Sequence, residues 1–366
     1  SPVEIEFRTA GRLFVLAGTD WDGGAEVART LEAIGRREPI PPLVTEVGTG
    51  FSVFSVTGRP GDRLLLPTQA MLVAARLTRL DRAPSPAAGR PDVLVIAGRP
   101  GCGTFSNFFQ VLGQLRWAEQ RGLAPVVYFN RVVCSWSEAG LHGARNAWDY
   151  LFRPVSFVTM ADLVPDPRAL EGLDAKAIAA ALGGRAVVRD DYLGEDVGVA
   201  GRIDTRQRAI AAGLAARHVR VRPELLARAE KLHRRYLGGH FVVGVHQRGT
   251  DKVHEAAPVP FERYRYEIDR LLAAEPQARI FAATDDAGFL AALEHVYGAR
   301  VVSTPSRRSR DGRPTHFGYP EGATEALIDV LLLAWSDHLV HGVSNVSAAV
   351  LVLNERLPHT DLSVNR

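Results

Sequence analysis

The sequence predicts an α/β protein with open, doubly wound sheets. Short runs rich in valine and isoleucine alternate, through most of the chain, with segments whose apolar residues recur at helical spacing. The runs are apolar without interruption, which is typical of strands that are buried on both faces of a parallel sheet. Repeated strand and helix pairs of this kind are the pattern of the doubly wound α/β class.

Eight runs are expected to form strands of such parallel sheets. They are RLFVLAG (12–18), DVLVIAG (92–98), APVVYF (124–129), RAVVRD (185–190), HFVVGVHQR (240–248), ARIFAATDD (278–286), ARVVS (299–303) and DHLVHG (337–342). Helices are expected over 108–115 and 261–272, where apolar residues recur every three or four positions. Residues 323–337 are apolar nearly all round, which predicts a buried helix.

The domain boundary is expected near residue 222. Pro223 can begin the helix ELLARAEKLHRRYL, because proline suits a first helical turn. We therefore predict an N-terminal α/β domain over 1–221 and a second domain over 222–366. A stretch rich in proline, alanine and glycine, RAPSPAAGRP (82–91), is expected to be a linker or a long loop.

Composition narrows the possible partners. The 366 residues carry a formal net charge of +3 at a pI of about 9.0, which suits an anionic small substrate but is too weak to indicate nucleic acid. Two cysteines make a disulfide framework improbable on composition alone and favour a reducing compartment. No apolar run reaches the ~18–20 residues of a membrane span, and no signal-peptide pattern opens the sequence. We expect a cytoplasmic protein.

The first motif is a glycine-rich turn, AGRPGCGTFSN (97–107), between a predicted strand and a predicted helix. Gly98 and Gly103 have the spacing of a Walker P-loop, but Thr104 stands where that loop needs lysine, so an ATPase or kinase reading is rejected. The dinucleotide pattern G-x-G-x-x-G is also absent. Two interpretations remain: an anion site at a helix N-terminus, or a turn that needs glycine only for its backbone conformation.

The second motif, VGVHQRGTDKVHE (243–255), ends another predicted strand. His246 and Arg248 are two positions apart, so they are expected to point to one side, and the Arg248 guanidinium could grip a diphosphate with two hydrogen bonds. Glu255, near Lys252, could serve as a general base, although charged loop residues are commonly only solvated. The spacing of the histidines matches no standard metal site.

The third motif, FAATDD (281–286), ends a further predicted strand with two aspartates. Asp286 could hold a ribose or a metal ion, or it could cap the helix that follows. Asp329 lies inside the apolar helix and needs a partner, since a lone buried carboxylate is costly. That partner could be the hydrogen-bond donors of a guanine edge, or an arginine or backbone group of the protein.

A small polar turn precedes the last predicted helix. Ser344, Asn345 and Ser347 follow the strand DHLVHG and form a second helix N-terminus that could bind an anion. Together with the first two motifs, this turn would fall at strand ends of α/β units. A nucleotide diphosphate-sugar could satisfy all of these groups at once.

In this order, the motifs PGCGTFSN, VHQRGTDKVHEAA, FAATDD and ALIDVLLLAWSDHLVHGVSNVSAAV resemble those of the α1,6-fucosyltransferases. The family includes rhizobial nodulation and eukaryotic core enzymes, within a wider group of α1,2- and protein O-fucosyltransferases. The resemblance is specific over about 222–352, thinner over 92–130, and absent over 1–90. It implies a GT-B-like fold in which two Rossmann-like domains face a cleft, with the acceptor side in 1–221.

The family resemblance also implies the chemistry. A GDP-sugar, most plausibly GDP-fucose by kinship, would bind mainly to 222–366 without a metal or other cofactor, and transfer to a glycan or small-molecule acceptor would invert the anomeric centre. Carried over by position, the roles fall on three groups of residues. The catalytic group is Arg248, Glu255 and Lys252, and the nucleotide-sugar group is Gly101, Gly103, Thr104, Phe105, His246, Asp286, Asp329, Ser344, Asn345 and Ser347.

Three departures from the family pattern bear on these roles. Gly249 stands where the family often has a second arginine, Phe105 replaces an expected glycine, and the spacing from Lys252 to Glu255 is one residue shorter. The alternative is therefore a nucleotide-sugar-binding or scaffold protein that has lost catalysis. Residues 1–90 and the region around 131–200, which includes Trp136 and Trp148, are expected to shape the acceptor side.

Overall fold

The computed structural model describes residues 3–6, 11–18, 36–37, 43–44, 50–58, 63–66, 71–74 and 92–364, apart from 250–257 and 315–318. The chain divides into two compact units, Ser1–Arg90 and Pro91–Arg366. The predicted division at 221/222 falls within the second unit, between two of its helices, and stays a prediction.

The described strands of the first unit are antiparallel. β5 (Gly50–Gly58) pairs with β2 (Gly11–Gly18), β3 (Arg36–Arg37) and β4 (Leu43–Val44), and β2 also pairs with β7 (Met71–Ala74). β1 (Val3–Glu6) and β6 (Arg63–Leu66) form a separate antiparallel pair. The expected strand at 12–18 therefore forms, but the expectation that it joins a parallel sheet is wrong. A continuous apolar run fits both kinds of sheet, and only the partner decides between them.

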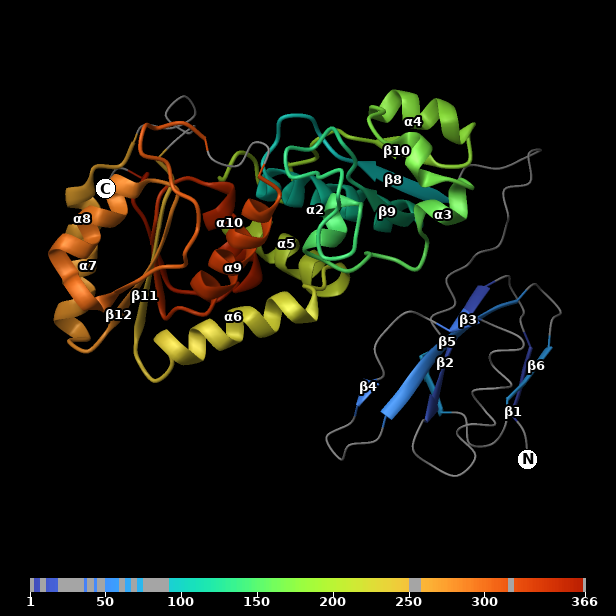
Figure 1. The fold of residues 1–366 in the computed structure, drawn as a ribbon, viewed down its shortest axis with the longest axis horizontal. Helices are drawn as coiled ribbons and strands as arrows, with labels where there is room; N and C mark the ends of the chain where they lie inside the picture. The colour runs from blue at the N-terminus through green and yellow to red at the C-terminus, as the bar shows by residue number, and fades with distance from the viewer. Residues whose placement is uncertain are drawn as a thin grey trace. The chain divides into compact units, whose positions relative to one another are not determined.

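The second unit holds two parallel sheets, and all seven of its predicted strands form (Figure 1). The smaller sheet has the order β10 (Val187–Arg189), β8 (Val93–Ala97), β9 (Ala124–Tyr128). The larger has the order β13 (Val301–Val302), β12 (Arg279–Thr284), β11 (Val242–Gln247), β14 (His338–His341), β15 (His359–Asp361). The α/β class with parallel sheets is thus confirmed for residues 91–366.

Helices connect these strands. Nine α-helices of the described residues follow β8 in the chain: α2 (Thr104–Arg121), α3 (Met160–Leu163), α4 (Ala175–Leu182), α5 (Thr205–His218), α6 (Pro223–Tyr236), α7 (Phe261–Ala274), α8 (Ala287–Tyr297), α9 (Glu321–Ala334) and α10 (Asn345–Leu353). Three described 3-10 turns lie among them: η1 (Ala147–Tyr150), η2 (Pro167–Leu170) and η4 (Gly298–Arg300). Pro223 is the first residue of α6, as the sequence predicts.

The larger sheet is buried on both faces, as its unbroken apolar strands predict. Val243 and Val245 of β11 pack into a core with α7 and α8, whereas Val242 and Phe281 belong to the core on the other face, with α9 and α10. Figure 1 shows α7 and α8 on one side of this sheet and α9 and α10 on the other. Adjacent residues of one strand thus enter different cores, because side chains alternate along a strand.

One of these cores continues into the smaller sheet. It joins Phe281 and the apolar residues of α9 and α10 to Leu94 and Ile96 of β8 and to Leu112 of α2. α10 contacts α2 and α5 as well as α9. The two sheets are therefore fastened together by shared apolar packing, which explains why residues 91–366 form one compact unit.

The strand order of the larger sheet marks where a ligand would bind. β11 is central, with β12 and β13 on one side and β14 and β15 on the other, so the order reverses between β11 and β14. In open α/β sheets, ligands bind beyond the carboxyl ends of the strands at this reversal. The sequence motifs after β11 and β14 lie at this point.

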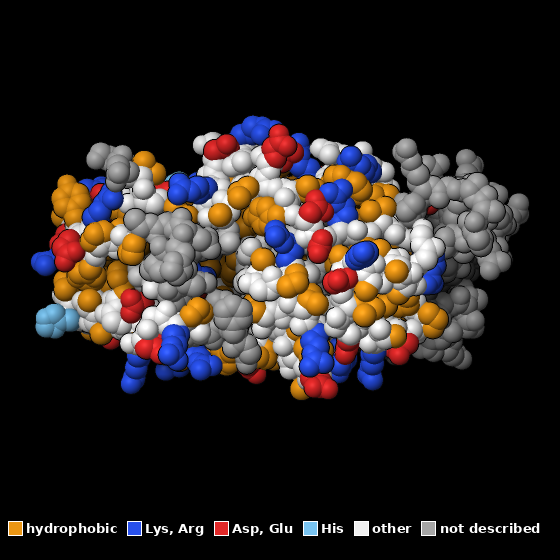
Figure 2. All heavy atoms as spheres, turned by 90° about the horizontal axis from the view of Figure 1, so that it is seen from above, with side chains coloured by type: hydrophobic (Ala, Val, Ile, Leu, Met, Phe, Trp, Pro, Cys, Tyr) orange, Lys and Arg blue, Asp and Glu red, His pale blue; other side chains and the backbone are white. Residues whose placement is uncertain are grey.

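On the face that Figure 2 shows, basic and acidic side chains of the described residues are interspersed. Within the part of the chain that the structure describes, no helix is both long and apolar enough to cross a bilayer.

Candidate functional site

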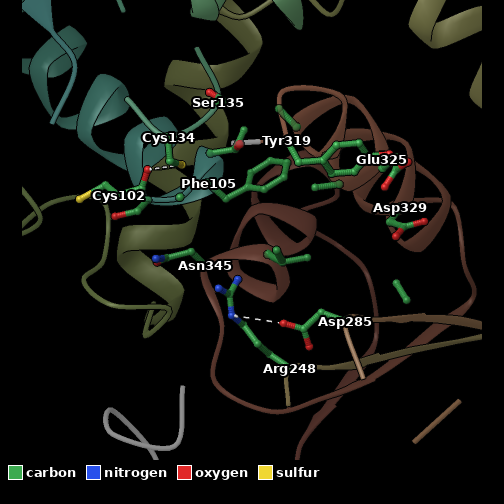
Figure 3. Close-up of a pocket in the computed structure, with 18 of the residues that line it drawn as sticks. Cys102, Phe105, Cys134, Ser135, Arg248, Asp285, Tyr319, Glu325, Asp329 and Asn345 are labelled. Carbon is green, nitrogen blue, oxygen red and sulfur yellow. Dashed lines mark hydrogen bonds and ion pairs between the residues drawn. The ribbon is translucent and has the colours of Figure 1, made fainter. Parts of the chain in front are cut away.

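A cavity of ≈ 590 Å³ lies within the second unit and is lined from both sheets. Its walls come from the loop between β8 and α2, the ends of β11 and β12, the helix α9 and the start of α10 (Figure 3). Of the residues expected at the site, the cavity is lined by Gly101, Gly103, Thr104, Phe105, His246, Arg248, Asp329 and Asn345. Lys252 and Glu255 lie outside the described residues.

The glycine-rich loop leads into an N-terminus of α2 that no described side chain caps. Gly101 has a φ of 69°, in the left-handed region that favours glycine, and Gly103 is the N-cap residue. The first turn holds no acidic residue. The helix therefore directs its first backbone N–H groups and its positive dipole end toward the cavity, which suits an anion.

Two side chains from outside the loop fix its shape. The carbonyl oxygen of Cys102 accepts hydrogen bonds from Asn107 Nδ2 at 3.3 Å and from the Cys134 thiol at 3.0 Å. Asn107 Oδ1 in turn accepts from the backbone N–H of Arg99 at 3.4 Å. Phe105 is only 4% exposed and packs edge-on against Phe108, so it also anchors the loop in the core.

His246, at the end of β11, is neutral and fixed in one tautomer. Its Nδ1 lies 3.0 Å from the carbonyl oxygen of Ala283, which can only accept, so Nδ1 carries the proton. Burial lowers the pKa of His246 to about 4. Its Nε2 is left as an acceptor with no hydrogen-bond partner among the described residues, so it suits a ligand hydroxyl or N–H group.

Arg248 directly follows β11 and points toward Asp285, which directly follows β12 (Figure 3). The guanidinium Nε lies 4.0 Å from Asp285 Oδ2, while Asp285 Oδ1 accepts from the backbone N–H of Gly249 at 2.8 Å. Asp285 thus holds the turn that presents Arg248. A Cβ at position 249 would lie 2.8 Å from Asp286 Cβ, so a second arginine would not fit here without movement of the backbone.

The two adjacent aspartates after β12 have different surroundings. Asp285 lines the cavity, whereas Asp286 is the N-cap of α8 and accepts from the backbone N–H groups of Gly288 and Phe289 at 2.7 and 3.2 Å. The structure therefore does not bring Asp286 into the cavity wall. The sequence left open which of the pair caps the helix.

Asp329 is a buried carboxylate at the far end of the cavity. It is 9% exposed, and its Oδ1 accepts a hydrogen bond of 2.6 Å from the Thr304 hydroxyl. Burial raises the pKa of Asp329 to about 7, although the Thr304 bond and the nearby Arg308 charge oppose the rise. The hydroxyl of Thr304 was not among the partners that the sequence suggested, because it lies 25 residues away.

Glu325, one helical turn before Asp329, lines the same end of the cavity and is held by protein groups. Its Oε1 accepts from the Tyr319 hydroxyl at 2.6 Å and its Oε2 from the backbone N–H of Arg307 at 3.1 Å. No sequence motif singled out Glu325, although its spacing of four residues from Asp329 puts both carboxylates on one face of α9.

The start of α10 forms another part of the wall. Ser344 caps the helix by accepting from the backbone N–H of Val346 at 3.1 Å, and the Ser347 hydroxyl donates to the carbonyl of Gly342 at 3.0 Å. Both serines are 1% exposed and do not line the cavity. Asn345 does line it, and its Oδ1 has no hydrogen-bond partner in the described part of the chain.

Other residues of the cavity wall were not singled out by motif. They include Arg99, Tyr192, Arg307 and Tyr319. Arg99 follows Gly98, the first residue after β8. Its place just beyond a strand end could have identified it from the sequence, because the carboxyl ends of parallel strands face the ligand site. Among the described residues, no group of three or more His, Cys, Asp or Glu side chains is placed to hold a metal ion.

Comparison of the sequence with protein-family models and with curated proteins finds no match. The fold, however, resembles solved fucosyltransferase structures. NodZ α1,6-fucosyltransferase soaked with GDP-fucose is similar with a TM-score of 0.49 at 18% identity, over 72% of this chain and 93% of NodZ. The fucosyltransferase NodZ from Bradyrhizobium gives a TM-score of 0.47 at 16% identity, over 74% and 94%. POFUT1 in complex with GDP-fucose gives 0.49 at 10% identity, over 76% and 100%.

Proposed function

We propose that this protein is an inverting, metal-independent glycosyltransferase of the α1,6-fucosyltransferase type, with a GT-B-like arrangement of two Rossmann-like domains. It transfers a sugar, L-fucose by kinship, from a GDP-sugar to a hydroxyl of a glycan or small-molecule acceptor. The observation that carries the proposal is a single cavity that combines an uncapped helix N-terminus, Arg248 and the buried carboxylate of Asp329. A nucleoside diphosphate needs all three kinds of group.

The diphosphate would lie between the N-terminus of α2 and Arg248. Backbone N–H groups at a helix start bind phosphate oxygens, and a guanidinium can donate two parallel hydrogen bonds to one phosphate. These groups come from different sheets but share the cavity. The close approach that Gly101 and Gly103 permit lets the backbone contact the ligand directly, since a Cβ at either position would meet only open space.

Asp329 would recognise guanine. The N1–H and N2–H₂ groups of guanine can donate two hydrogen bonds to one carboxylate, whereas adenine presents an acceptor at N1 and uracil lacks the second donor. Burial raises the pKa of Asp329 to about 7. A base that donates two hydrogen bonds favours the ionised form, so guanine compensates the cost of burying this charge.

Transfer requires a base for the acceptor and stabilisation of the leaving diphosphate. The acceptor oxygen would attack the anomeric carbon from the face opposite to the diphosphate, and its proton would pass to a base. The bond from the anomeric carbon to the diphosphate oxygen would break with its electron pair, which adds one negative charge to the departing GDP. Arg248 and the N–H groups of α2 would stabilise that charge. Glu255, with Lys252 nearby in sequence, is our proposal for the base.

Calorimetric titration of GDP, ADP and UDP in the presence of EDTA tests the binding part of this proposal. We expect GDP to bind at least 10-fold more tightly than ADP or UDP, about 1.4 kcal/mol of discrimination or more. Asp329→Asn should remove the preference for GDP, because the NH₂ group of the asparagine would face one of the N–H donors of guanine. Equal affinities for the three nucleotides would overturn guanine recognition and reopen the donor.

Hydrolysis of GDP-fucose, followed as release of GDP, tests the catalytic part. Slow hydrolysis by the wild-type protein, lost in Arg248→Ala but kept in Arg228→Ala, is the expected result. Arg228 is an exposed arginine of α6 away from the cavity, so it controls for the loss of one positive charge. Tight GDP binding without turnover, even with candidate glycan acceptors, would instead favour a binding or scaffold protein.

A further inference from the structure

We infer that Arg99 binds the diphosphate of the donor, as a second guanidinium that reaches the site from the other sheet than Arg248. The inference rests on the proposed function and adds a residue to its donor site. Arg99 follows β8 of the smaller sheet by two positions and lines the cavity together with the N-terminus of α2. It lies outside the motif around Arg248 and was not assigned a role by any sequence pattern.

A backbone hydrogen bond positions Arg99 at the cavity, and its guanidinium takes no part in that bond. Its N–H donates to Asn107 Oδ1, the same side chain that fixes the loop at Cys102. The residue is half-buried, and its guanidinium carbon lies 6.0 Å from the centre of the Tyr192 ring. Among the described residues, no carboxylate forms an ion pair with Arg99 and no side chain accepts a hydrogen bond from its guanidinium.

The other two arginines of the cavity wall lie elsewhere in the fold. Arg248 follows β11, and its Nε lies 4.0 Å from Asp285 Oδ2. The guanidinium of Arg307 lies over the ring of Tyr319 at 5.4 Å, and its backbone N–H donates to Glu325. Arg99 is therefore the arginine of the described wall that comes from the same loop as the N-terminus of α2.

The negative charge of the GDP-sugar diphosphate favours a second cation beside Arg248. Three arginines and three carboxylates (Arg99, Arg248, Arg307, Asp285, Glu325 and Asp329) line the cavity, so once guanine has ionised Asp329 the described wall has no net positive charge to offer a diphosphate as a whole. Positive potential must then be local. Arg99 and the positive N-terminal end of α2 belong to the same part of the cavity wall. The departing GDP would gain a further negative charge beside them during transfer.

The turn after β11 cannot supply this second cation itself. A Cβ on Gly249 would lie 2.8 Å from Asp286 Cβ and 2.9 Å from its Oδ2, so the position beside Arg248 is restricted to glycine in this backbone conformation. A guanidinium from the β8 loop reaches the same cavity without that conflict. The two arginines would then contact the diphosphate from different sides.

Two other roles for Arg99 predict different results. It could only support Tyr192 through a cation–π contact, in which case its loss would disturb the whole cavity. It could instead contact the acceptor, in which case binding of the free nucleotide would not change. Comparing ligands with and without the diphosphate separates these roles.

The experiment is calorimetric titration of guanosine and GDP into the wild type, Arg99→Ala, Arg99→Lys and the control Arg228→Ala. We expect Arg99→Ala to weaken GDP binding by about 10- to 100-fold, the usual effect of losing a hydrogen bond to a charged group, and to leave guanosine binding unchanged. Arg99→Lys should lie between Arg99→Ala and the wild type, because lysine keeps the charge but loses the planar fork. Arg228→Ala should match the wild type.

Each other outcome has a distinct meaning. Equal losses for guanosine and GDP in Arg99→Ala would overturn the inference in favour of support for Tyr192. Unchanged GDP binding would overturn it in favour of an acceptor contact or no contact. A wild-type protein that does not bind GDP would overturn the proposed function, and the inference with it.

Discussion

At pH 8, Asp329→Asn should raise the free energy of unfolding measured without nucleotide. The same substitution should abolish guanine recognition. Burial raises the pKa of Asp329 from 3.8 to about 7. Between these values the folded protein keeps a proton that the unfolded chain has released, so the free energy of unfolding falls as the pH rises, and the loss is complete above about pH 7. A difference of about 3 pKa units corresponds to about 4 kcal/mol at 1.36 kcal/mol per unit.

The asparagine variant has no proton to lose, and its amide oxygen can still accept from the Thr304 hydroxyl. Its advantage over the wild type should therefore be small near pH 4 and should grow by about 2–3 kcal/mol between pH 5 and pH 8. Urea denaturation followed by tryptophan fluorescence measures this, since four of the five tryptophans belong to residues 91–366. GDP titration of the same samples measures the loss of recognition.

Asp149→Asn is the matched control. Burial also raises the pKa of Asp149 to about 7, but Asp149 lines a different cavity, beside β9. This variant should show the same direction of stability change with pH and should keep the affinity for GDP. A lower stability of Asp329→Asn at pH 8, or an advantage that is the same at pH 5 and pH 8, would refute the reasoning about the buried carboxylate.

Four further predictions concern the same unit. Gly98→Ala should lower the free energy of unfolding by about 1–3 kcal/mol, because the new Cβ would lie 2.3 Å from Val133 Cγ1, and a lower melting temperature would show this. Gly103→Ala, whose Cβ meets only open space, should cost less than about 1 kcal/mol by thermal melting but should weaken GDP binding; the opposite ranking in stability would contradict the loop geometry. Arg208→Ala should destabilise by about 2–4 kcal/mol in urea, because its guanidinium donates to the carbonyls of Leu351, Asn354 and Leu357, and an unchanged midpoint would argue against that role. GDP binding should release protons below pH 7, because Asp329 must ionise, so calorimetry at pH 6 in two buffers of different ionisation enthalpy should give different heats, and identical heats would count against it.

The sequence predicted the second unit better than the first. Its unbroken apolar strands, helical spacing and Pro223 all reflect local rules, and the corresponding strands and helices form. The short strand β15 has three residues, His359–Asp361, and no apolar run to reveal it. The direction of β2 depends on its partners in the first unit, which lie 33 or more residues away in the chain and which no periodicity identifies.

Site residues could be predicted where they lie at the end of a strand. They could not be predicted where they depend on a hydrogen-bond partner that is distant in the chain. His246 and Arg248 follow from the end of β11, and their place in the cavity wall needs only the alternation of side chains. The bond from Thr304 to Asp329 and the thiol of Cys134 at the Cys102 carbonyl join segments 25 and 32 residues apart. Such contacts come from the packing of whole elements, so a motif cannot contain them.

The core shared by the two sheets sets an order for folding during synthesis. α2 ends at Arg121, and α10, against which it packs, begins at Asn345, so more than 200 residues must be translated between them. At ~5–20 residues per second, the nascent smaller sheet waits about 10–45 s for the helix that completes its apolar packing. During this interval the ribosome-bound chain exposes the apolar face of α2 that α10 later covers, so we expect the yield in a heterologous host to rise with chaperone supply.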